Sequence, residues 1–308
     1  MKSFVFLFFS LPAILFSQPH QPSASQIKLS LKKLNFLGST LYVAAHPDDE
    51  NTRVIAWLAN ERLAVTAYLS MTRGDGGQNL IGPEIRDQLG LIRTQELITA
   101  RKIDGGEQFF TRANDFGYSK SADETLAIWN KNEILSDVVR IYRTFQPDVV
   151  ITRFPPDERA GHGHHTSSAM LAQEAFDLSG LTTAYPDQLV TLPVWKPIRV
   201  YTNTGRFFSN TIDENTPGVT TLNVGGYNAL LGASYAEIAA ASRSQHKSQG
   251  FGASGRRGDA QEYFELTKGA PATADIFDGV NTTWSRVKGG NAVQPLVEKA
   301  IREFDIEK

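Results

Sequence analysis

The sequence predicts an α/β protein whose mostly parallel sheet is covered by helices on both faces. Short apolar, strand-like runs alternate with longer helix-like segments, and most of these runs end at a proline or a glycine-rich turn. The chain has 308 residues, of which 41% are hydrophobic and 21% are charged, as in ordinary globular proteins. This length fits one large domain with a substantial core.

The first predicted elements begin near residue 40. Residues 40–45 (TLYVAA) form a predicted strand that stops at His46-Pro47, because proline cannot continue a central strand. Residues 51–62 carry apolar side chains at helical spacing and are predicted as a helix. Residues 63–71 form the next predicted strand, which ends in a glycine-rich turn.

The next elements continue the same alternation. Residues 85–103 and 133–145 show helical periodicity, and the second of these helices is halted by Gln146-Pro147. Residues 148–154 (DVVITRF) form a predicted buried strand, and a helix from about residue 166 to 176 completes the unit.

Three segments describe the expected organisation of the chain. Residues 1–17 are a predicted signal peptide, residues 18–37 a lead-in, and residues 38–308 one catalytic domain. After residue 180 the elements shorten and the Gly, Pro, Asn and Thr content rises, so residues 181–308 are predicted as irregular C-terminal decoration of that domain.

The N-terminal segment indicates export to the periplasm or the exterior of the cell. Lys2 precedes an apolar run over residues 4–16, and a polar stretch that contains prolines follows it. Such a run spans about 20 Å as a helix, which is short of the roughly 30 Å hydrocarbon core of a bilayer. We therefore expect no stable membrane insertion after processing, with an uncleaved anchor as the alternative.

Charge and cysteine content exclude several classes of function. The formal net charge is −2, which gives no electrostatic basis for binding nucleic acid. The chain has no cysteine, which excludes disulfides, thiol catalysis and Cys-ligated zinc. A metal ion would therefore bind His, Asp or Glu side chains, and the oligomeric state stays open.

The side chains that favour metals gather where two predicted strands end. These segments are residues 45–50 (AHPDDE) and residues 160–165 (AGHGHH), and together they hold four of the six histidines of the chain. Ligands of open α/β sheets bind at the carboxyl ends of the strands. The two segments are therefore expected to meet.

This pattern favours a catalytic metal site. His46 and Asp49 are three residues apart in a turn and can point at one ion, while a histidine of the second segment completes the set. Zinc is the first choice, although other divalent ions suit the same ligands. Asp48 lies beside them and can act as a general base. Helix capping by Asp48 or Asp49, and a solvated histidine loop, are the alternatives.

The same residues resemble the PIG-L/LmbE-like de-N-acetylase family, which includes N-acetylglucosaminyl-phosphatidylinositol de-N-acetylase. The first segment together with residues 162–165 (HGHH) carries the resemblance. Residues 93–97 (RTQEL), 146–150 (QPDVV) and 244–249 (SQHKSQ) support it. The similarity runs from about residue 38 to residue 250.

The resemblance implies a Rossmann-like domain that hydrolyses the acetamide of an N-acetylglucosamine-type sugar or glycoconjugate, or a related amide. By similarity, zinc would be held by His46, Asp49 and His165. The other implied roles are general base for Asp48, oxyanion stabilisation for His162 and substrate orientation for Arg93.

The second motif departs from the family pattern at Gly163-His164, where the family commonly has Pro-Asp. The missing carboxylate would orient and charge the neighbouring histidine, so the protonation state of His162 is open. His164 is also an alternative metal ligand.

Three further sites are possible substrate contacts, each with a structural alternative. Asp115 could contact sugar hydroxyls or stabilise a turn, and His246 could form a rim over the substrate or end a helix. Arg256-Arg257 could bind an anionic group or face solvent.

The predicted function is zinc-dependent hydrolysis of an N-acetylated amino sugar or glycoconjugate, with release of acetate and a free amine. One alternative is a metal-dependent amidase that acts on a non-sugar amide or a thiol conjugate. The other is a carbohydrate-binding protein that lacks turnover because His164 replaces the family acid.

Overall fold

The computed structural model describes residues 21–205, 208, 212, 213 and 215–307. The predicted signal peptide, residues 1–17, lies outside the described residues. Within the described part of the chain, no helix combines the length and the apolar character that crossing a membrane requires.

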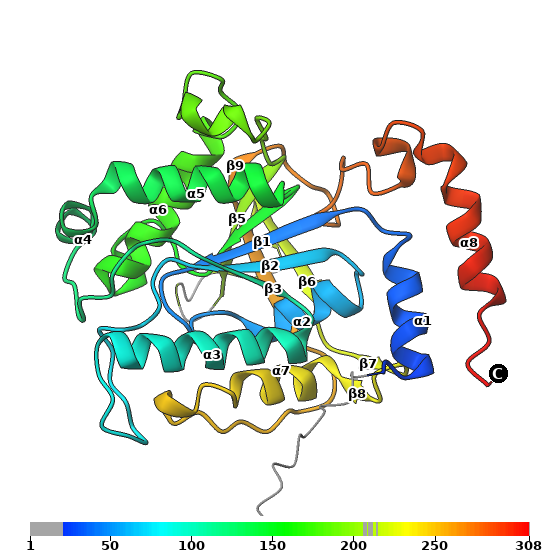
Figure 1. The fold of residues 1–308 in the computed structure, drawn as a ribbon, viewed down its shortest axis with the longest axis horizontal. Helices are drawn as coiled ribbons and strands as arrows, with labels where there is room; N and C mark the ends of the chain where they lie inside the picture. The colour runs from blue at the N-terminus through cyan, green and yellow to red at the C-terminus, as the bar shows by residue number, and fades with distance from the viewer. Residues whose placement is uncertain (1–20, 206–207, 209–211, 214, 308) are drawn as a thin grey trace, which may run out of the picture.

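A seven-stranded sheet forms the centre of the molecule (Figure 1), with the strand order β3-β2-β1-β4-β5-β9-β6. The strands are β1 Ser39–Ala44, β2 Val65–Ser70, β3 Glu107–Phe110, β4 Val149–Thr152, β5 Arg199–Thr204, β6 Val219–Asn223 and β9 Gln261–Gly269. The five strands from β3 to β5 are parallel, whereas β9 is antiparallel to both of its neighbours. The predicted α/β class with a mostly parallel sheet is confirmed.

Helices cover both faces of this sheet (Figure 1). On one side lie α2 Thr52–Asn60, α3 Asp87–Asp104 and α7 Tyr235–Arg243, and on the other lie α4 Ala122–Trp129, α5 Lys131–Phe145 and α6 Gly163–Leu178. Away from these layers, α1 Ala24–Lys33 packs beside α8 Gln294–Glu303. The short strands β7 Tyr227–Asn228 and β8 Ala233–Ser234 pair with each other.

The sequence of β1 explains the two-sided burial. Side chains alternate across a strand, and here Leu41 and Val43 pack into the core under α4, α5 and α6. Tyr42 and Ala44 pack into the core on the opposite face, with residues of α2. All six residues of the strand are buried, which is why it reads as a continuous apolar run rather than an alternating one.

Most predicted elements are found within a few residues of their expected bounds, and two differences matter. Helix α6 begins at Gly163 rather than near residue 166, so His164 and His165 lie in its first turn. Residues 181–308 are not only irregular decoration, because they supply β5, β6 and β9 to the central sheet and also form α7 and α8. The polar strand β9 (QEYFELTKG) is partly exposed and lacks the apolar run that marks the parallel strands.

The chain order places a ligand crevice at one edge of the sheet. From β1 the chain continues to β2 and β3 on one side, and β4 and β5 lie on the other side. In such sheets the crevice opens at the carboxyl ends of the strands where the order reverses. Here those ends belong to β1 and β4, and they lead into the two histidine-containing segments.

Candidate active site

The turn after β1 brings His46 and Asp49 together. Asp49 Oδ2 accepts a hydrogen bond from the backbone N–H of His46 at 2.7 Å, and it lies 3.1 Å from His46 Nδ1. The turn is tight because Asp48 has a φ of 94°, in the left-handed region that non-glycine residues rarely adopt. Backbone strain of this kind is concentrated at functional sites, where surrounding contacts hold it.

His165 reaches the same turn from the start of α6. Its Nδ1 lies 3.1 Å from the carbonyl oxygen of Ala160, which can only accept, so Nδ1 carries the proton. This leaves Nε2 unprotonated, 3.5 Å from Asp49 Oδ1. The ring is held in place by stacking on Phe154, with ring centroids 3.7 Å apart.

His46, Asp49 and His165 form a group that could hold a metal ion. One ligand atom from each lies within 4.8 Å of the others. The neutral tautomer of His165, fixed by a backbone carbonyl on its other nitrogen, is the arrangement typical of metal-ligating histidines. Although burial alone would raise the pKa of Asp49, the neighbouring imidazoles of His165 and His46 hold that pKa below its usual range.

Asp48 points beside this group and is held by Arg93. Arg93 Nη2 donates to Asp48 Oδ1 at 3.0 Å and also to the carbonyl of Pro47. Burial raises the pKa of Asp48 to about 6, against the opposing charge of Arg93. Arg93 itself is 3% exposed and does not line the cleft described below, so this geometry makes it a residue that positions Asp48 rather than one that touches a substrate.

His164 is fully buried beside His46. Its Nδ1 lies 2.9 Å from His46 Nε2, while its own Nε2 is buried with no hydrogen-bond partner. The ring packs against Phe116 and Trp129, and burial lowers its pKa to about 2. His164 is therefore neutral at neutral pH. It also belongs to a second possible ligand group, together with His46 and His162.

Asp115 lies next to these imidazoles. Its carboxylate is 3.8 Å from His164 Nδ1 and 3.9 Å from His46 Nε2, and it is held by the backbone N–H of Gly117. The Asp115 carboxylate thus lies beside these imidazoles, although it comes from a different loop than position 164, where the family motif commonly has Asp. Asp115 is 5% exposed and does not line the cleft described below, but it lines a separate pocket together with Gly76 and Phe116.

His162 caps α6 and is half-buried. Its Nδ1 accepts the backbone N–H of His164 at 3.1 Å, and its Nε2 faces the backbone N–H of Ser119, with 3.5 Å between the two nitrogens. Burial, together with the nearby His46 and His165, lowers the pKa of His162 to about 4. The side chain is therefore neutral at neutral pH.

Close packing around residue 163 explains why it is a glycine. Its N–H donates to the carbonyl of Ser119 at 2.8 Å, a bond that proline could not make. A Cβ built on Gly163 would come within 2.3 Å of the carbonyl oxygen of Ser121. The close approach of this segment explains why the chain departs from Pro at position 163.

His246 lies in a buried ionic network behind the turn. Its Nε2 is 2.9 Å from Glu50 Oε1, and Arg101 Nη2 reaches the same oxygen at 3.0 Å. Arg101 also pairs with Asp104, and Glu50 Oε2 accepts the backbone N–H of Asp48. His246 is 0% exposed and does not line the cleft, so the structure gives it this network instead of the expected rim position.

Replacing Glu50 by Gln should lower the free energy of unfolding by about 3 kcal/mol, because Arg101 and His246 lose a fully buried anionic partner. Urea denaturation monitored by circular dichroism measures the change. The matched control is Glu133→Gln, since that carboxylate is 52% exposed and 3.7 Å from Arg112; an exposed pair contributes roughly 0–1 kcal/mol. Equal destabilisation by the two variants would contradict the structural role of the network.

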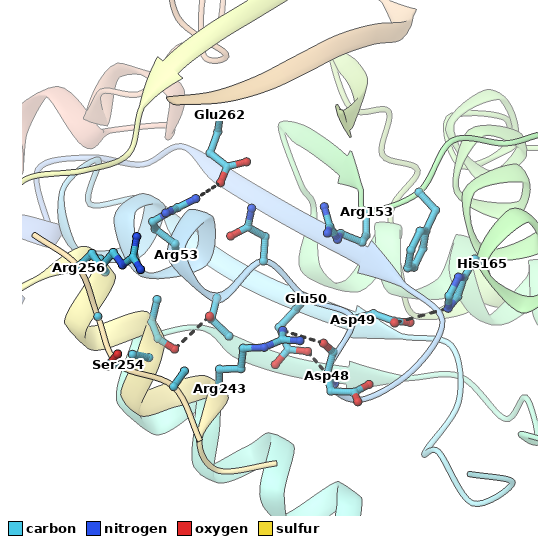
Figure 2. Close-up of a pocket in the computed structure, with 18 of the residues that line it drawn as sticks. Asp48, Asp49, Glu50, Arg53, Arg153, His165, Arg243, Ser254, Arg256 and Glu262 are labelled. Atoms are coloured by element: carbon cyan, nitrogen blue, oxygen red, sulfur yellow. Dashed lines mark hydrogen bonds and ion pairs between the residues drawn. The ribbon is translucent and has the colours of Figure 1, made fainter. Parts of the chain in front are cut away.

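A cleft of about 760 Å³ opens beside Asp48, Asp49 and His165 (Figure 2). Its walls come from the turn after β1, the N-terminus of α2, the end of β4, helix α7, and residues 253–256 and 262. Four arginines take part in the lining, namely Arg53, Arg153, Arg243 and Arg256.

Sequence reasoning found only Arg256 of these four arginines. Arg257, its neighbour in the sequence, points elsewhere and pairs with Glu237. Arg153 directly follows β4, and its place at a strand end is a signal that could have been used. Arg53 and Arg243 lie on helices whose packing partners cannot be read from local sequence.

Comparison with known families finds a match over residues 41–176 to the family described as PIG-L: GlcNAc-PI de-N-acetylase. A deacetylase of Kineococcus radiotolerans that acts on 1D-myo-inositol 2-acetamido-2-deoxy-alpha-D-glucopyranoside is 31% identical over 160 residues. This match covers 44% of the present chain and 44% of the relative, so the chain spans less than half the length of that protein.

Two solved structures are similar to this chain at low sequence identity. The 4-carboxy-2-hydroxymuconate hydratase of Pseudomonas putida KT2440 is 18% identical, with a TM-score of 0.50 over 78% of this chain and 99% of that one. The N,N'-diacetylchitobiose deacetylase of Pyrococcus horikoshii is also 18% identical, with a TM-score of 0.48 over 68% of this chain and 70% of that one. Fold does not decide chemistry, so the reaction has to be argued from the site.

Proposed function

We propose that the protein is a metal-dependent hydrolase that removes the acetyl group from an N-acetylated amino sugar or glycoconjugate, because residues 41–176 are similar to the PIG-L family. The observation that carries the proposal is the convergence of His46, Asp49 and His165 beside Asp48, at the wall of a cleft. A cleft of this volume lies within the roughly 300–1,000 Å³ range of small-molecule sites.

The donor set fits a divalent cation, and we propose zinc. Two neutral imidazoles and one carboxylate are the ligands of many catalytic zinc sites, and the set leaves a coordination position open. The unprotonated Nε2 of His165 and the low pKa of Asp49 keep both donors ready to bind a cation. When bound, such a cation supplies Lewis-acid chemistry, which polarises an acyl oxygen and lowers the pKa of water.

Asp48 moves the protons of this reaction. Its carboxylate takes a proton from the attacking water as the new O–C bond forms at the acyl carbon. It then returns that proton to the nitrogen as the C–N bond breaks, so acetate and a free amine leave. A pKa of about 6 suits both steps, because the group is ionised at neutral pH and is still basic enough to accept a proton.

His162 contributes a hydrogen bond rather than a charge. Its Nδ1 accepts the backbone N–H of His164, so this role requires that Nε2 carries the proton and turns away from the backbone N–H of Ser119, whose nitrogen is 3.5 Å away. A neutral donor can stabilise the oxygen that becomes negative in the transition state. The carboxylate that the family motif places at position 164 is not needed for this role, because the ring does not have to be charged.

Chelation should abolish activity reversibly. We expect the protein to release acetate from N-acetylglucosamine or one of its glycosides, to lose this activity after treatment with EDTA, and to recover it on addition of Zn²⁺. Acetate is measured by an enzyme-coupled assay and the metal by elemental analysis. Full activity in protein shown to be free of metal would refute the mechanism. Activity confined to non-sugar amides or thiol conjugates would show that the substrate is not an N-acetylated sugar.

A further inference from the structure

The cleft is lined by four arginines and four carboxylates, but only one arginine of the lining pairs with a carboxylate of the lining. Its four carboxylates, Asp48, Asp49, Glu50 and Glu262, are all engaged: Asp49 belongs to the metal group, and the other three have arginine partners. Two of those partners, Arg93 and Arg101, lie outside the lining. Among the four arginines of the lining, Arg53 pairs with a carboxylate that also lines the cleft, since its Nη2 lies 2.7 Å from Glu262 Oε1.

The other three arginines of the lining have no carboxylate partner among the described residues. They are Arg153, Arg243 and Arg256. A divalent cation on His46, Asp49 and His165 would add further positive charge. The cleft therefore favours an anion for reasons that are independent of the metal ligands.

Arg153 and Arg243 are built into the walls. Arg153 follows β4, and its guanidinium lies over the rings of Phe154 and Phe208, at 5.9 and 5.6 Å from their centroids. Arg243 ends α7, lies over Phe251 at 4.0 Å and donates to the carbonyl of Asp48 at 3.1 Å. Aromatic faces and a carbonyl hold both groups, which leaves donors of each planar fork for a ligand.

Figure 2 shows how these two groups lie relative to the catalytic turn. Arg153 is drawn above the segment from Asp48 to Glu50, near His165, and Arg243 is drawn below it, near Asp48. Arg53 and Arg256 lie farther along the cleft, away from the metal group. A substrate whose acetamide reached the metal group would thus pass two unpaired guanidinium groups.

We propose that the substrate carries an anionic group, a carboxylate or a phosphate, on the sugar or on its substituent, and that Arg153 and Arg243 bind this group. The inference rests on the proposed deacetylase function for its substrate class. Arginine suits the role because its planar donors pair with two oxygens of a carboxylate or a phosphate at once. Neutral N-acetyl sugars would leave both guanidinium groups without a counter-ion.

The test compares three probes that share one N-acetyl sugar core. They are N-acetylglucosamine, which is neutral, N-acetylglucosamine 6-phosphate, and N-acetylmuramic acid, which has a carboxylate. Binding to the zinc-loaded Asp48→Asn protein is measured by calorimetry, so that turnover does not interfere. At least one anionic probe should bind about 10-fold more tightly than the neutral sugar, because hydrogen bonds to charged groups are the stronger ones. The anionic probe that binds more tightly identifies the chemistry of the group.

Variants then locate the binding group. Arg153→Gln and Arg243→Gln should each lower the ratio of anionic to neutral affinity by about 10-fold, and the Lys variants should keep part of it, because they retain the charge but lose the planar fork. Arg302→Gln is the matched control, since this exposed arginine lies on α8, far from the cleft, and the ratio should stay as in wild type.

The outcomes separate this inference from the proposed function. Equal affinity for all three probes would overturn the inference even if wild-type protein released acetate from N-acetylglucosamine. Preferential binding that survived both arginine variants would also overturn it, because the anion would then be held by the metal. Arginine-dependent binding without acetate release from any probe would support the anion site and refute the deacetylase.

Discussion

Replacing Asp48 by Asn should lower kcat by about 10²–10⁴-fold while the metal content stays at the wild-type level, because general acid–base catalysis supplies a factor of this size. Asn removes the proton acceptor but keeps the shape of the side chain. It also tolerates the positive φ of this position better than most residues, so the turn that carries His46 and Asp49 should persist. Acetate release and elemental analysis on the same preparation measure the two quantities.

The matched control for this variant is Asp177→Asn. Asp177 is a 52% exposed carboxylate on α6 that pairs with Lys268, and its replacement should change kcat by no more than about twofold. If Asp48→Asn retained wild-type kcat, another group would have to move the protons. If it lost the metal as well, Asp48 would be part of the ligand set.

Replacing His165 by Ala should remove both the metal and the activity. The imidazole is one of only three protein donors in the group, and its loss leaves two. We expect the variant to purify with little zinc. In addition, Zn²⁺ should raise the melting temperature of wild type but not of the variant, because a ligand that binds only the folded state stabilises it.

His164→Phe is the comparison that assigns the ligand set. Phenylalanine keeps a ring against Phe116 and Trp129 but offers no ligand atom, so this variant should retain zinc. Zinc lost from His164→Phe but retained by His165→Ala would place the ion in the alternative group of His46, His162 and His164.

Local sequence could predict the parts of the site that depend on short-range order. His46, Asp48 and Asp49 lie in one turn after a strand whose six residues are all buried, and both the strand and its end are visible as a pattern. The meeting of this turn with His165 follows from the topology, because β1 and β4 are adjacent parallel strands.

The roles of Arg93, Asp115 and His246 depended on packing that no local pattern contains. Each is a predicted substrate contact, with a turn as the alternative for Asp115 and a helix end for His246, and each is at most 5% exposed. Arg93 holds Asp48, Asp115 lies beside two imidazoles, and His246 pairs with a glutamate 196 residues away in the chain. Burial of a polar side chain follows from which distant segments cover it, and such segments are visible only in the folded chain.

The C-terminal strands were missed for a related reason. β9 pairs with β5 and β6 in antiparallel orientation, and most of its residues are only partly buried. Its sequence (QEYFELTKG) mixes charged, polar and apolar residues, unlike the apolar runs of β1 and β4. Short-range hydrophobicity identified the parallel strands β1, β2 and β4 but not β3, β5, β6 or β9.

The residues that line the cleft come from two separate stretches of the chain. The residues assigned to bond cleavage fall before residue 176, whereas Arg243, Arg256 and Glu262 come from after residue 234. Two stretches of polypeptide thus meet at one cavity: the earlier one holds the proposed catalytic groups and Arg153, and the later one adds Arg243 and Arg256. A swap of the later stretch with that of a homologue should redirect which molecules are processed and leave the chemical step intact.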